Sequence, residues 1–435
     1  MRDARLPWPR RLALLVAWTV VPPLAGAARA ADAAAAEPPL EAVSFDEAVR
    51  RAIDHNHDVA RAATSILEAE ALLGRARAAV KPSVDAQAVE TQLDGERGFG
   101  GTVVRPDRQL VLLATAAVPV LAPMRWAATA QAADRVGIAR LEAADVRKQV
   151  AVAAAQAYLA IITERRQLEI DERARDHARA HFDHARTRFE GGSGSKLNAL
   201  RAADVLATDE ALVERSRATL RLAQEALGVL LAADRAIDAG AEPVFDLPPA
   251  EPEPALGERS DLRLLAARRD AAERVLRDSW KDWMPTIEAA FSPEHVDPAG
   301  AFEEADTWRA TVGARIPLYA GGERRADRRL RAAAAESAAI ELEQAELLAR
   351  GEVRAAWIAI EAATRALTHA RLAAEHADDV LRITDVAFRA GATTNIELID
   401  AQRRARDSES GVGEAEDVLR QARLRLLVAL GRFPG

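Results

Sequence analysis

The sequence contains the same segment twice, and this internal duplication constrains the fold more than any other feature. WMPTIEAAFS, which begins at Trp283, repeats VKPSVDAQAV, which begins at Val80. Farther along, ARIPLYAGGERR matches the earlier segment AAVPVLAPMRWA. FRAGATTNIELIDAQ, from Phe388, matches FEGGSGSKLNALRAA, from Phe189. The matches keep the same order and nearly the same spacing. A duplicated chain of this kind usually builds a pseudo-symmetric object, and we expect that one repeat does not fold alone.

The composition indicates a helix-rich protein. The 435 residues are dominated by alanine and arginine, and aromatic residues make up only 4%. Such a composition argues against a compact α/β enzyme. The absence of cysteine excludes disulfides, a thiol nucleophile and a lipid anchor attached through cysteine.

Residues 1–30 are expected to be a signal peptide. An arginine-containing leader precedes an apolar stretch, and Ala28-Arg29-Ala30 places small residues where a signal peptidase cleaves. A membrane anchor is the alternative, but two prolines and a glycine interrupt the apolar run before it is long enough to span a bilayer. Cleavage removes five arginines and one aspartate from a chain that already has a net charge of −8. An acidic mature chain argues against nucleic acid as a partner.

The remainder divides into a tail, two repeats and a linker. Residues 31–43 are expected to be an extended N-terminal tail, and residues 44–238 form the first repeat. Residues 239–258 are rich in proline and are expected to link it to the second repeat, residues 259–435. Each repeat predicts the same order: helix, strand, loop, strand, very long helix, tight turn and return helix.

Two very long helices are predicted because helix-breaking residues are rare in two segments of the sequence. Residues 123–189 and 322–388 have almost no glycine and no internal proline, which gives helices of about 100 Å each at 1.5 Å per residue. Gly191, Gly192 and Gly391 mark the turns at the helix tips. A four-three spacing in the second helix predicts a coiled-coil-like seam through Val353, Trp357, Ile360, Thr364 and Leu367.

The strands are predicted where the hydrophobic period changes from 3.6 to 2. The first helix is expected to run from Ser44 to about Val80, where a proline follows. Alternation then indicates four strands in two separate hairpins, near residues 84–88, 110–118, 287–292 and 307–316. In the last strand Arg309, Thr311 and Arg315 share one face and apolar residues share the other. A single such hairpin would fit a soluble core equally well.

Four short strands cannot close a membrane barrel, because the smallest barrels need about eight strands. Twelve strands from three chains give a passage wide enough for solutes. Arg309, Thr311 and Arg315 would then face water, and the apolar side chains would face lipid. The predicted fold class is therefore mainly α with a small β part, in which the long helices continue the same wall as a tube.

The chain resembles the TolC-like outer-membrane efflux proteins. The resemblance covers essentially the whole mature chain and depends on three motifs in order, VSFDEAVRRAIDHNHDV, IPLYAGGERR and FRAGATTNIELIDAQRR. It implies a homotrimer with a 12-stranded barrel in the outer membrane and an α-helical barrel in the periplasm. It also implies an exit duct for an inner-membrane pump, joined through a periplasmic adaptor, with no enzymatic activity and no cofactor. Between the second strand and the long helix of the first repeat, the sequence reads VLAPMRW, where the family prefers a glycine pair.

A periplasmic coiled-coil adaptor or scaffold is the alternative, since adaptors also contain long helical hairpins. An adaptor has one hairpin inserted in its β domains, whereas this sequence has two equivalent hairpins. The cargo stays open between drugs, metal cations and secreted polypeptides.

The resemblance also implies an acidic constriction at the periplasmic tips, and Glu397 and Asp400 occupy the matching positions. Their i, i+3 spacing places both on one helix face, and three chains would form carboxylate rings that attract cations. The first repeat has Arg201 at the position of Asp400, and Arg201 is expected to pair with Asp400 of a neighbouring copy. The alternative is two solvated acids on an exposed helix.

Three histidines form the second candidate site. His177, His181 and His184 follow i, i+4, i+7 and share a helix face near Asp176 and Asp183, a pattern that suits a transition metal. A solvated helix face is the alternative. No Ser/His/Asp arrangement and no glycine-rich phosphate loop is found in context, so no catalytic or cofactor-binding residue is expected.

Overall fold

The computed structural model describes residues 40–249 and 256–433, and the described chain from Glu41 onward forms one compact unit. The expected signal peptide and nearly all of the expected tail lie outside the described residues, as does the central part of the proline-rich linker.

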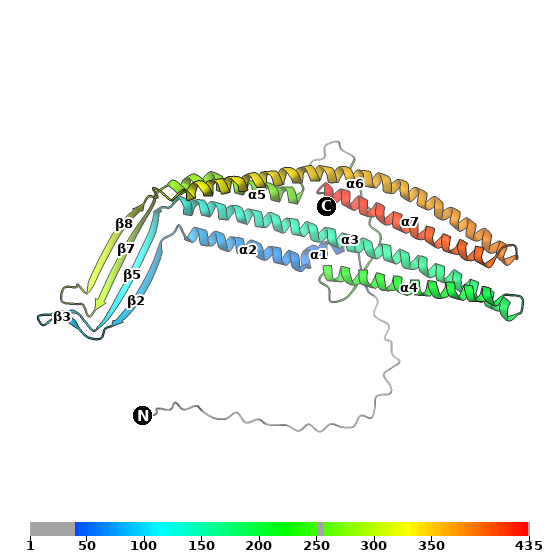
Figure 1. The fold of residues 1–435 in the computed structure, drawn as a ribbon, viewed down its shortest axis with the longest axis horizontal. Coiled ribbons are helices and arrows are strands. Elements are labelled where there is room, and N and C mark those ends of the chain that lie inside the picture. The colour runs from blue at the N-terminus through cyan, green and yellow to red at the C-terminus, as the bar shows by residue number, and fades with distance from the viewer. Residues whose placement is uncertain (1–39, 250–255, 434–435) are drawn as a thin grey trace, which may run out of the picture. The chain divides into compact units, whose positions relative to one another are not determined.

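The two repeats have the same order of elements (Figure 1). The first repeat consists of α1 (Phe45–His55), α2 (His57–Ala78), β2 (Ser83–Gln92), β5 (Arg108–Leu121), α3 (Pro123–Glu190) and α4 (Lys196–Leu230). The second consists of α5 (Ser260–Arg277), the 3₁₀ helix η1 (Asp278–Trp283), β7 (Thr286–Asp297), β8 (Asp306–Arg315), α6 (Glu323–Arg389) and α7 (Asn395–Ala429). This order confirms the mainly α fold with two tandem repeats.

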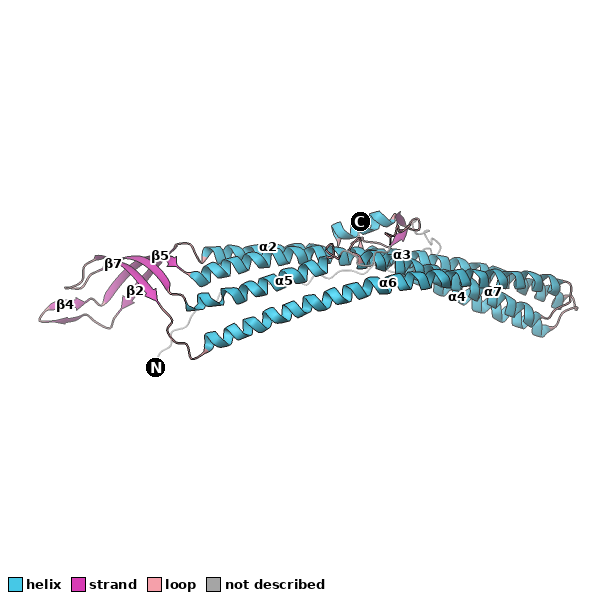
Figure 2. Ribbon diagram, turned by 90° about the horizontal axis from the view of Figure 1, so that it is seen from above, coloured by secondary structure: helices cyan, strands magenta, loops and turns pink. Residues whose placement is uncertain are grey.

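The long helices have the predicted length. Helices α3 and α6 contain 68 and 67 residues, and their return helices α4 and α7 contain 35 each. Each long helix packs against its return helix, and the sheet lies at the other end of the bundle (Figure 2). Charged residues recur throughout, and none of the helices in the described part of the chain has an apolar stretch long enough to cross a bilayer.

The buried seam of α6 contains alanines at two positions that differ from the predicted ones. Val353 and Leu367 are buried as predicted, but Thr364 is exposed, and Ala356 and Ala363 occupy the buried positions between them. The four-three spacing is therefore present, shifted toward the smaller side chains, because alanine permits close approach of the two helix backbones.

The expectation of one continuous helix from Ser44 to Val80 is wrong. The chain breaks at Asn56, whose backbone is extended (φ −64°, ψ 136°) between α1 and α2. The Asn56 side chain accepts a 2.8 Å hydrogen bond from Asp58 N and donates a 3.1 Å bond to Leu230 O. It therefore caps α2 and anchors it to the end of α4, a distant contact that local periodicity does not reveal.

The four long strands form one antiparallel sheet in the order β2-β5-β7-β8. The sequence predicted two separate hairpins, but β5 pairs with β7 and joins them. Val84, Ala116, Phe291 and Ala310 are register partners across all four strands. Strands β2 and β8 are the two edges of this sheet.

Two smaller sheets occur in segments predicted to be irregular. Strands β3 (Arg97–Phe99) and β4 (Thr102–Arg105) form a hairpin inside the expected polar loop. Strand β1 (Glu41–Val43), at the end of the expected tail, pairs in parallel with β6 (Ile237–Ala239).

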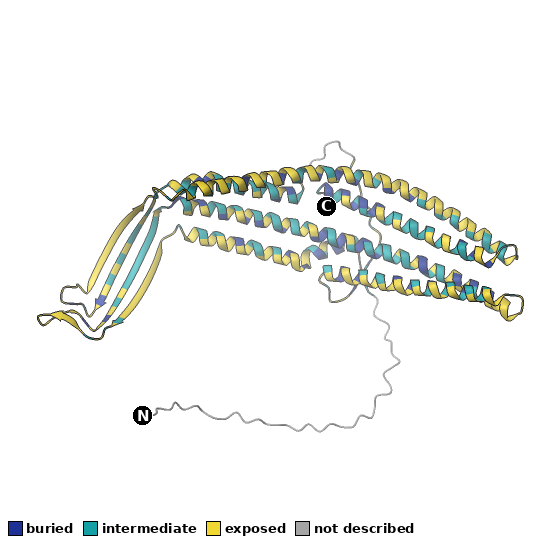
Figure 3. Ribbon diagram, viewed as in Figure 1, coloured by how far each residue is buried: buried dark blue, intermediate teal, exposed yellow. Residues whose placement is uncertain are grey.

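The main core lies midway along the helices, where α1, α3, α4, β1 and β6 meet (Figure 3). Tyr158 and Ile161 are fully buried there, and the Phe45 ring meets the Tyr158 ring edge to face at 5.4 Å. The Tyr158 hydroxyl donates a 2.8 Å hydrogen bond to Ala241 O, so the chain that leaves the first repeat is held against α3. The core therefore fixes the middle of the bundle, while the sheet lies outside it.

Candidate functional site

One face of the four-stranded sheet carries most of its polar residues, together with apolar ones such as Leu113 and Ala117, and the other face is apolar except at its far end, where His295 contacts Asp306. Because side chains alternate along strands, the observed register aligns the two faces across both repeats. The polar face carries Asp85, Gln87, Thr115, Glu288, Ser292, Arg309, Thr311 and Arg315. The apolar face carries Val84, Ala86, Leu112, Ala114, Ala116, Phe291, Trp308, Ala310 and Val312. On the polar face Thr115 Oγ1 and Ser292 Oγ lie 3.3 Å apart, which links the two repeats.

Most of both faces is left uncovered by the rest of the described chain; the exception is the far end of the polar face, where Gln109 and Val296 are buried and Gln109 donates a 2.9 Å hydrogen bond to Glu303. Val84, Trp308 and Val312 on the apolar face are 75%, 71% and 76% exposed, and every residue of β8 is exposed. A contiguous apolar surface of this kind marks a contact with lipid or with another protein. Arg309, Thr311 and Arg315, the residues predicted to face water, all lie on the opposite side.

Both edges of the sheet are unpaired in the described chain. Strand β2 pairs only with β5, and β8 pairs only with β7. The outer N–H and C=O groups of two long strands therefore have no partner strand. Long unpaired edges favour the addition of a further strand from another copy.

At the other end of the bundle, glycines form the turns between the paired helices. Gly191 N donates a 2.9 Å hydrogen bond to Thr187 O and ends α3. Gly192 and Gly391 both have a φ of +75°, in the left-handed region that side chains with a Cβ rarely adopt. The structure places all three predicted tip residues in these turns.

Glu397 stabilises the start of its own helix. Its carboxylate accepts a 3.0 Å hydrogen bond from Thr394 N and a bond from Thr393 Oγ1, while Thr394 Oγ1 accepts from Glu397 N. These hydrogen bonds, the one from Thr393 first, lower the pKa of the exposed Glu397 carboxyl. Sequence reasoning missed this capping box of α7, although the residues Thr394 and Glu397 have the required spacing.

Asp400 lies one turn farther along and pairs with Arg404 at 2.8 Å. Arg201, on α4, makes no hydrogen bond or ion pair to Glu397 or Asp400 within the described residues. The structure therefore brings Glu397 and Asp400 to the same end of α7, but it does not bring Arg201 to them within one chain.

The three histidines do not come together as metal ligands. The His181 ring is buried, its Nε2 lies 2.8 Å from Asn395 Oδ1, and its ring meets Phe388 edge to face at 5.4 Å. The His184 ring packs against the same phenylalanine, whereas His177 lines a cavity elsewhere on α3. Among the residues that the structure describes, no three His, Asp or Glu side chains are placed to hold a metal ion. Within one described chain, helix packing gives His177, His181 and His184 different environments, so a metal site formed by them stays a prediction.

Instead, His181 and Asn395 join the two hairpins near their tips. Both side chains are buried, and His181 Nδ1 and Asn395 Nδ2 have no hydrogen-bond partner among the described residues. Burial lowers the pKa of His181, which favours the neutral ring.

A cavity of about 630 Å³ lies between α3, α4, α6 and α7 and contains a second link between the hairpins. Arg406 Nη1 donates a 2.9 Å hydrogen bond to Asp209 Oδ1, and Asp209 is almost fully buried. Burial raises the pKa of Asp209, and the guanidinium of Arg406 opposes that shift. Nothing in the spacing of residues 209 and 406 pointed to this pair.

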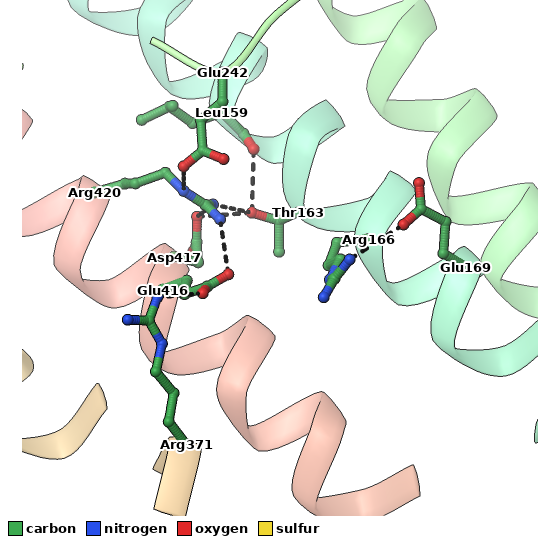
Figure 4. Close-up of polar contacts among 9 residues, drawn as sticks. All are labelled: Leu159, Thr163, Arg166, Glu169, Glu242, Arg371, Glu416, Asp417 and Arg420. Atoms are coloured by element: carbon green, nitrogen blue, oxygen red, sulfur yellow. Dashed lines mark hydrogen bonds and ion pairs between the residues drawn. The ribbon is translucent and has the colours of Figure 1, made fainter. Parts of the chain in front are cut away.

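A third link lies midway along the bundle and is centred on Arg420 (Figure 4). Arg420 on α7 donates a 2.6 Å hydrogen bond to Glu242 and contacts Thr163 of α3 at 3.4 Å. Asp417 accepts a 2.7 Å hydrogen bond from the same threonine. Glu416 continues the network to α6 through Arg371, at 2.8 Å. The two repeats are thus tied together by α7 at three levels.

These features define one subunit of a membrane channel wall: a two-faced sheet with open edges, continued by two long helical hairpins. Residues 48–233 and 252–432 match the family model described as outer membrane efflux protein. Because the two matches cover most of the chain, one in each repeat, the protein belongs to this family. It is therefore an outer-membrane protein with a periplasmic helical part, and it is a channel protein rather than an enzyme.

Solved structures have the same fold. CusC, described with transmembrane channel formation, matches with a TM-score of 0.77 and 16% identity, over 89% of this chain and 91% of its own. The CmeC outer membrane channel of Campylobacter jejuni matches with a TM-score of 0.77 and 14% identity, over 89% and 85%. The open state of the MtrE outer membrane channel of Neisseria gonorrhoeae matches with a TM-score of 0.73 and 17% identity, over 89% of this chain and 88% of its own. A comparison with curated proteins found no significant match.

Proposed function

We propose that three copies of this chain form the exit duct of a tripartite efflux system. The duct would carry small solutes, drugs or metal cations, from an inner-membrane pump across the periplasm and the outer membrane. The observation that carries this proposal is the four-stranded sheet, which has a polar face, an apolar face and two open edges. The members of the family are homotrimeric channels that work with adaptor and pump partners.

In the proposed trimer, β8 of one copy pairs with β2 of the next. Three four-stranded sheets then close into a 12-stranded barrel without an unpaired edge. The apolar face, with Trp308 and Val312, contacts lipid, and Arg309, Thr311 and Arg315 line the water-filled passage. In this arrangement the apolar face that is exposed in a single copy contacts lipid, and the polar face stays in water.

The helical hairpins continue the passage, and their tips are where a periplasmic adaptor would dock. We place the constriction of the closed duct at Glu397 and Asp400, which lie on the first turns of α7 beside the tip turn. Arg201 would pair with Asp400 of a neighbouring copy. Both acids already have partners in their own chain, so a latch through Arg201 requires Asp400 to exchange its contact with Arg404.

Cell fractionation tests the duct directly. The mature protein is expected in the outer-membrane fraction as an oligomer that survives an unboiled gel and dissociates on heating. A soluble single chain in the periplasm would contradict the proposal. The alternative of a periplasmic adaptor gains no support from the structure, since the family model matches both repeats.

The cargo requires a separate experiment. A deletion strain should be compared with its parent for sensitivity to detergents and dyes, and to zinc, cobalt and cadmium. The described residues of one chain contain no group of three His, Asp or Glu side chains placed to hold a metal ion, so the structure adds no ligand set in favour of metal export. Loss of tolerance to one class of compound alone would identify the cargo.

A further inference from the structure

The corner between β8 and α6 carries an arginine-rich surface that the channel function does not explain. Residues 323–331 contain five arginines and two acids. The side chains of Arg325, Arg328 and Arg329 are exposed, and none makes a hydrogen bond or ion pair to the described residues. More than half of the arginines in the described part of the chain do have such partners, among them Arg179, Arg217 and Arg371. We call Arg325, Arg328 and Arg329 the corner arginines.

The duplication shows that the long-helix fold does not require this charge. Residues 125–133 occupy the matching corner of the first repeat and contain one arginine, Arg125. That arginine has partners, because it contacts Glu288 at 3.7 Å and donates a 3.2 Å hydrogen bond to Ala79 O. Both corners begin a helix of nearly the same length, so the extra charge of the second corner serves something other than helix formation.

Exposed apolar and aromatic side chains adjoin the corner arginines. Leu318 and Tyr319, in the turn before α6, are 85% and 88% exposed. Trp283 is half exposed, and the guanidinium of Arg324 stacks over its ring at 4.9 Å from the centroid. Arg324 also donates a 2.8 Å hydrogen bond to Pro317 O, which fixes this turn against the start of the helix. Aromatic residues beside arginines are typical of the boundary between a membrane and water.

The corner follows the sheet directly in the chain. Strand β8 ends at Arg315 and α6 begins at Glu323, so seven residues separate the exposed sheet from the helix bundle (Figures 1 and 2). If the apolar face contacts lipid, as proposed above, the corner lies at the level of the headgroups of the leaflet that faces the helices. Those headgroups carry phosphodiester anions, and arginine binds phosphate oxygens through paired N–H groups.

We infer that the corner arginines, with Tyr319 and Trp283 beside them, form a docking surface for anionic phospholipid headgroups. The inference rests on the proposed function, because the membrane level of the corner follows from it. The surface would fix the depth of the sheet in the bilayer, and all of its arginines belong to the second repeat. The first repeat, with one neutralised arginine, would contribute little to it.

The test uses the full-length protein purified as the native oligomer in a non-ionic detergent and then delipidated. It is titrated with phosphatidylglycerol, which is anionic, and with phosphatidylcholine, which is zwitterionic, and bound lipid is counted by native mass spectrometry. The variant combines Arg325→Gln, Arg328→Gln and Arg329→Gln. The matched control removes the same charge from three exposed arginines far from the corner, by Arg215→Gln, Arg354→Gln and Arg425→Gln.

Wild type and control are expected to prefer phosphatidylglycerol. The corner variant is expected to bind it about a hundred-fold more weakly, since each of the three cations near an anionic surface contributes roughly a five-fold gain in affinity. An unchanged preference in the corner variant would overturn the inference. So would a corner variant that loses its heat-stable oligomer while its subunits keep the lipid preference, because the arginines would then be a contact between copies.

A lysine variant shows whether the glutamine variant loses binding through loss of charge or through poor folding. Cell fractionation separates the lipid-docking inference from the proposed exit duct. Lysine at all three positions keeps the charge and should keep most of the preference; if it does not, the binding depends on something other than charge at the corner. Outer-membrane location without a headgroup preference would remove this inference and leave the exit duct intact. A soluble single chain would remove both.

Discussion

Arg420 Nε donates a 2.6 Å hydrogen bond to Glu242 Oε1, and this contact ties the segment after the first repeat to the last helix of the second. The Arg420 side chain is 8% exposed, whereas Glu242 is 56% exposed, so the cation is the buried partner. Asp417 and Glu416 lie 3.6 and 3.8 Å from the same guanidinium. One buried arginine therefore contacts three acids from two parts of the chain.

Replacing Arg420 with methionine is expected to destabilise the protein. The substitution keeps the length of the side chain but leaves the three acids without their shared cation. Breaking a buried pair costs several kcal/mol, and the exposure of Glu242 reduces the expected loss to about 1–3 kcal/mol. Thermal unfolding of the purified oligomer measures it.

The control for this substitution is Arg166→Met, in the same region (Figure 4). Arg166 pairs with Glu169 at 3.4 Å, and both side chains are about half exposed. A surface pair of this kind contributes about 0–1 kcal/mol, so the unfolding temperature should hardly change. Equal losses for the two variants would mean that the Arg420 network is not a stabilising junction.

The stability of the helix tips is expected to fall as the pH falls below neutrality. Burial lowers the pKa of His181 in the folded protein, so below the ordinary pKa of histidine the unfolded chain binds more protons. The stabilisation is thus complete above about pH 6.5 and is lost progressively as the pH falls toward the folded-state pKa. His184 opposes protonation of His181, and Asp385 favours it, as does the hydrogen bond to Asn395.

Thermal unfolding of wild type and His181→Gln at pH 7.5 and pH 5.5 checks this expectation. Glutamine can still bond to Asn395 but does not titrate. The difference between the two pH values should be larger for wild type than for His181→Gln, and His369→Gln, at an exposed position on α6, should behave like wild type. A wild type and a His181→Gln variant with the same pH dependence would show that protonation occurs elsewhere.

The glycine at the tip of the second hairpin is expected to resist substitution. Gly391 has a φ of +75°, where a Cβ costs about 1 kcal/mol or more, so Gly391→Ala should lower stability by that amount. Gly411 is the matched control, since it lies inside α7 with open space where the methyl group of an alanine would extend. Gly411→Ala should raise stability by up to about 1 kcal/mol. Hydrogen exchange of the α6–α7 turn should increase only in the first variant.

Local pattern was enough to predict the repeats, the long helices and the glycine turns, because each depends on residues close together in the sequence. The same pattern did not predict contacts between distant segments. The break at Asn56 depends on Leu230 O, and the joining of β5 to β7 depends on how the two repeats meet. In the seam, Ala363 is buried instead of Thr364 because the approach of the helices decides which small residue faces inward. The Asp209–Arg406 pair has no sequence signal at all for the same reason.

The last prediction concerns the proposed constriction and separates the charge of Glu397 from its capping role. Alanine at residue 397 removes both, so an effect on conductance could come from a frayed helix start. Glutamine keeps an oxygen that can accept the bond from Thr394 N, and Asp400→Asn leaves the size of that side chain unchanged. If rings of these acids narrow the closed duct and attract cations, Glu397→Gln with Asp400→Asn should lower cation selectivity in planar bilayers, and Glu397→Ala with Asp400→Ala should also raise conductance. Thr394→Ala, which removes the side-chain cap and keeps both charges, is the control and should leave selectivity as it is. An unchanged selectivity in both double variants would place the constriction elsewhere in the passage.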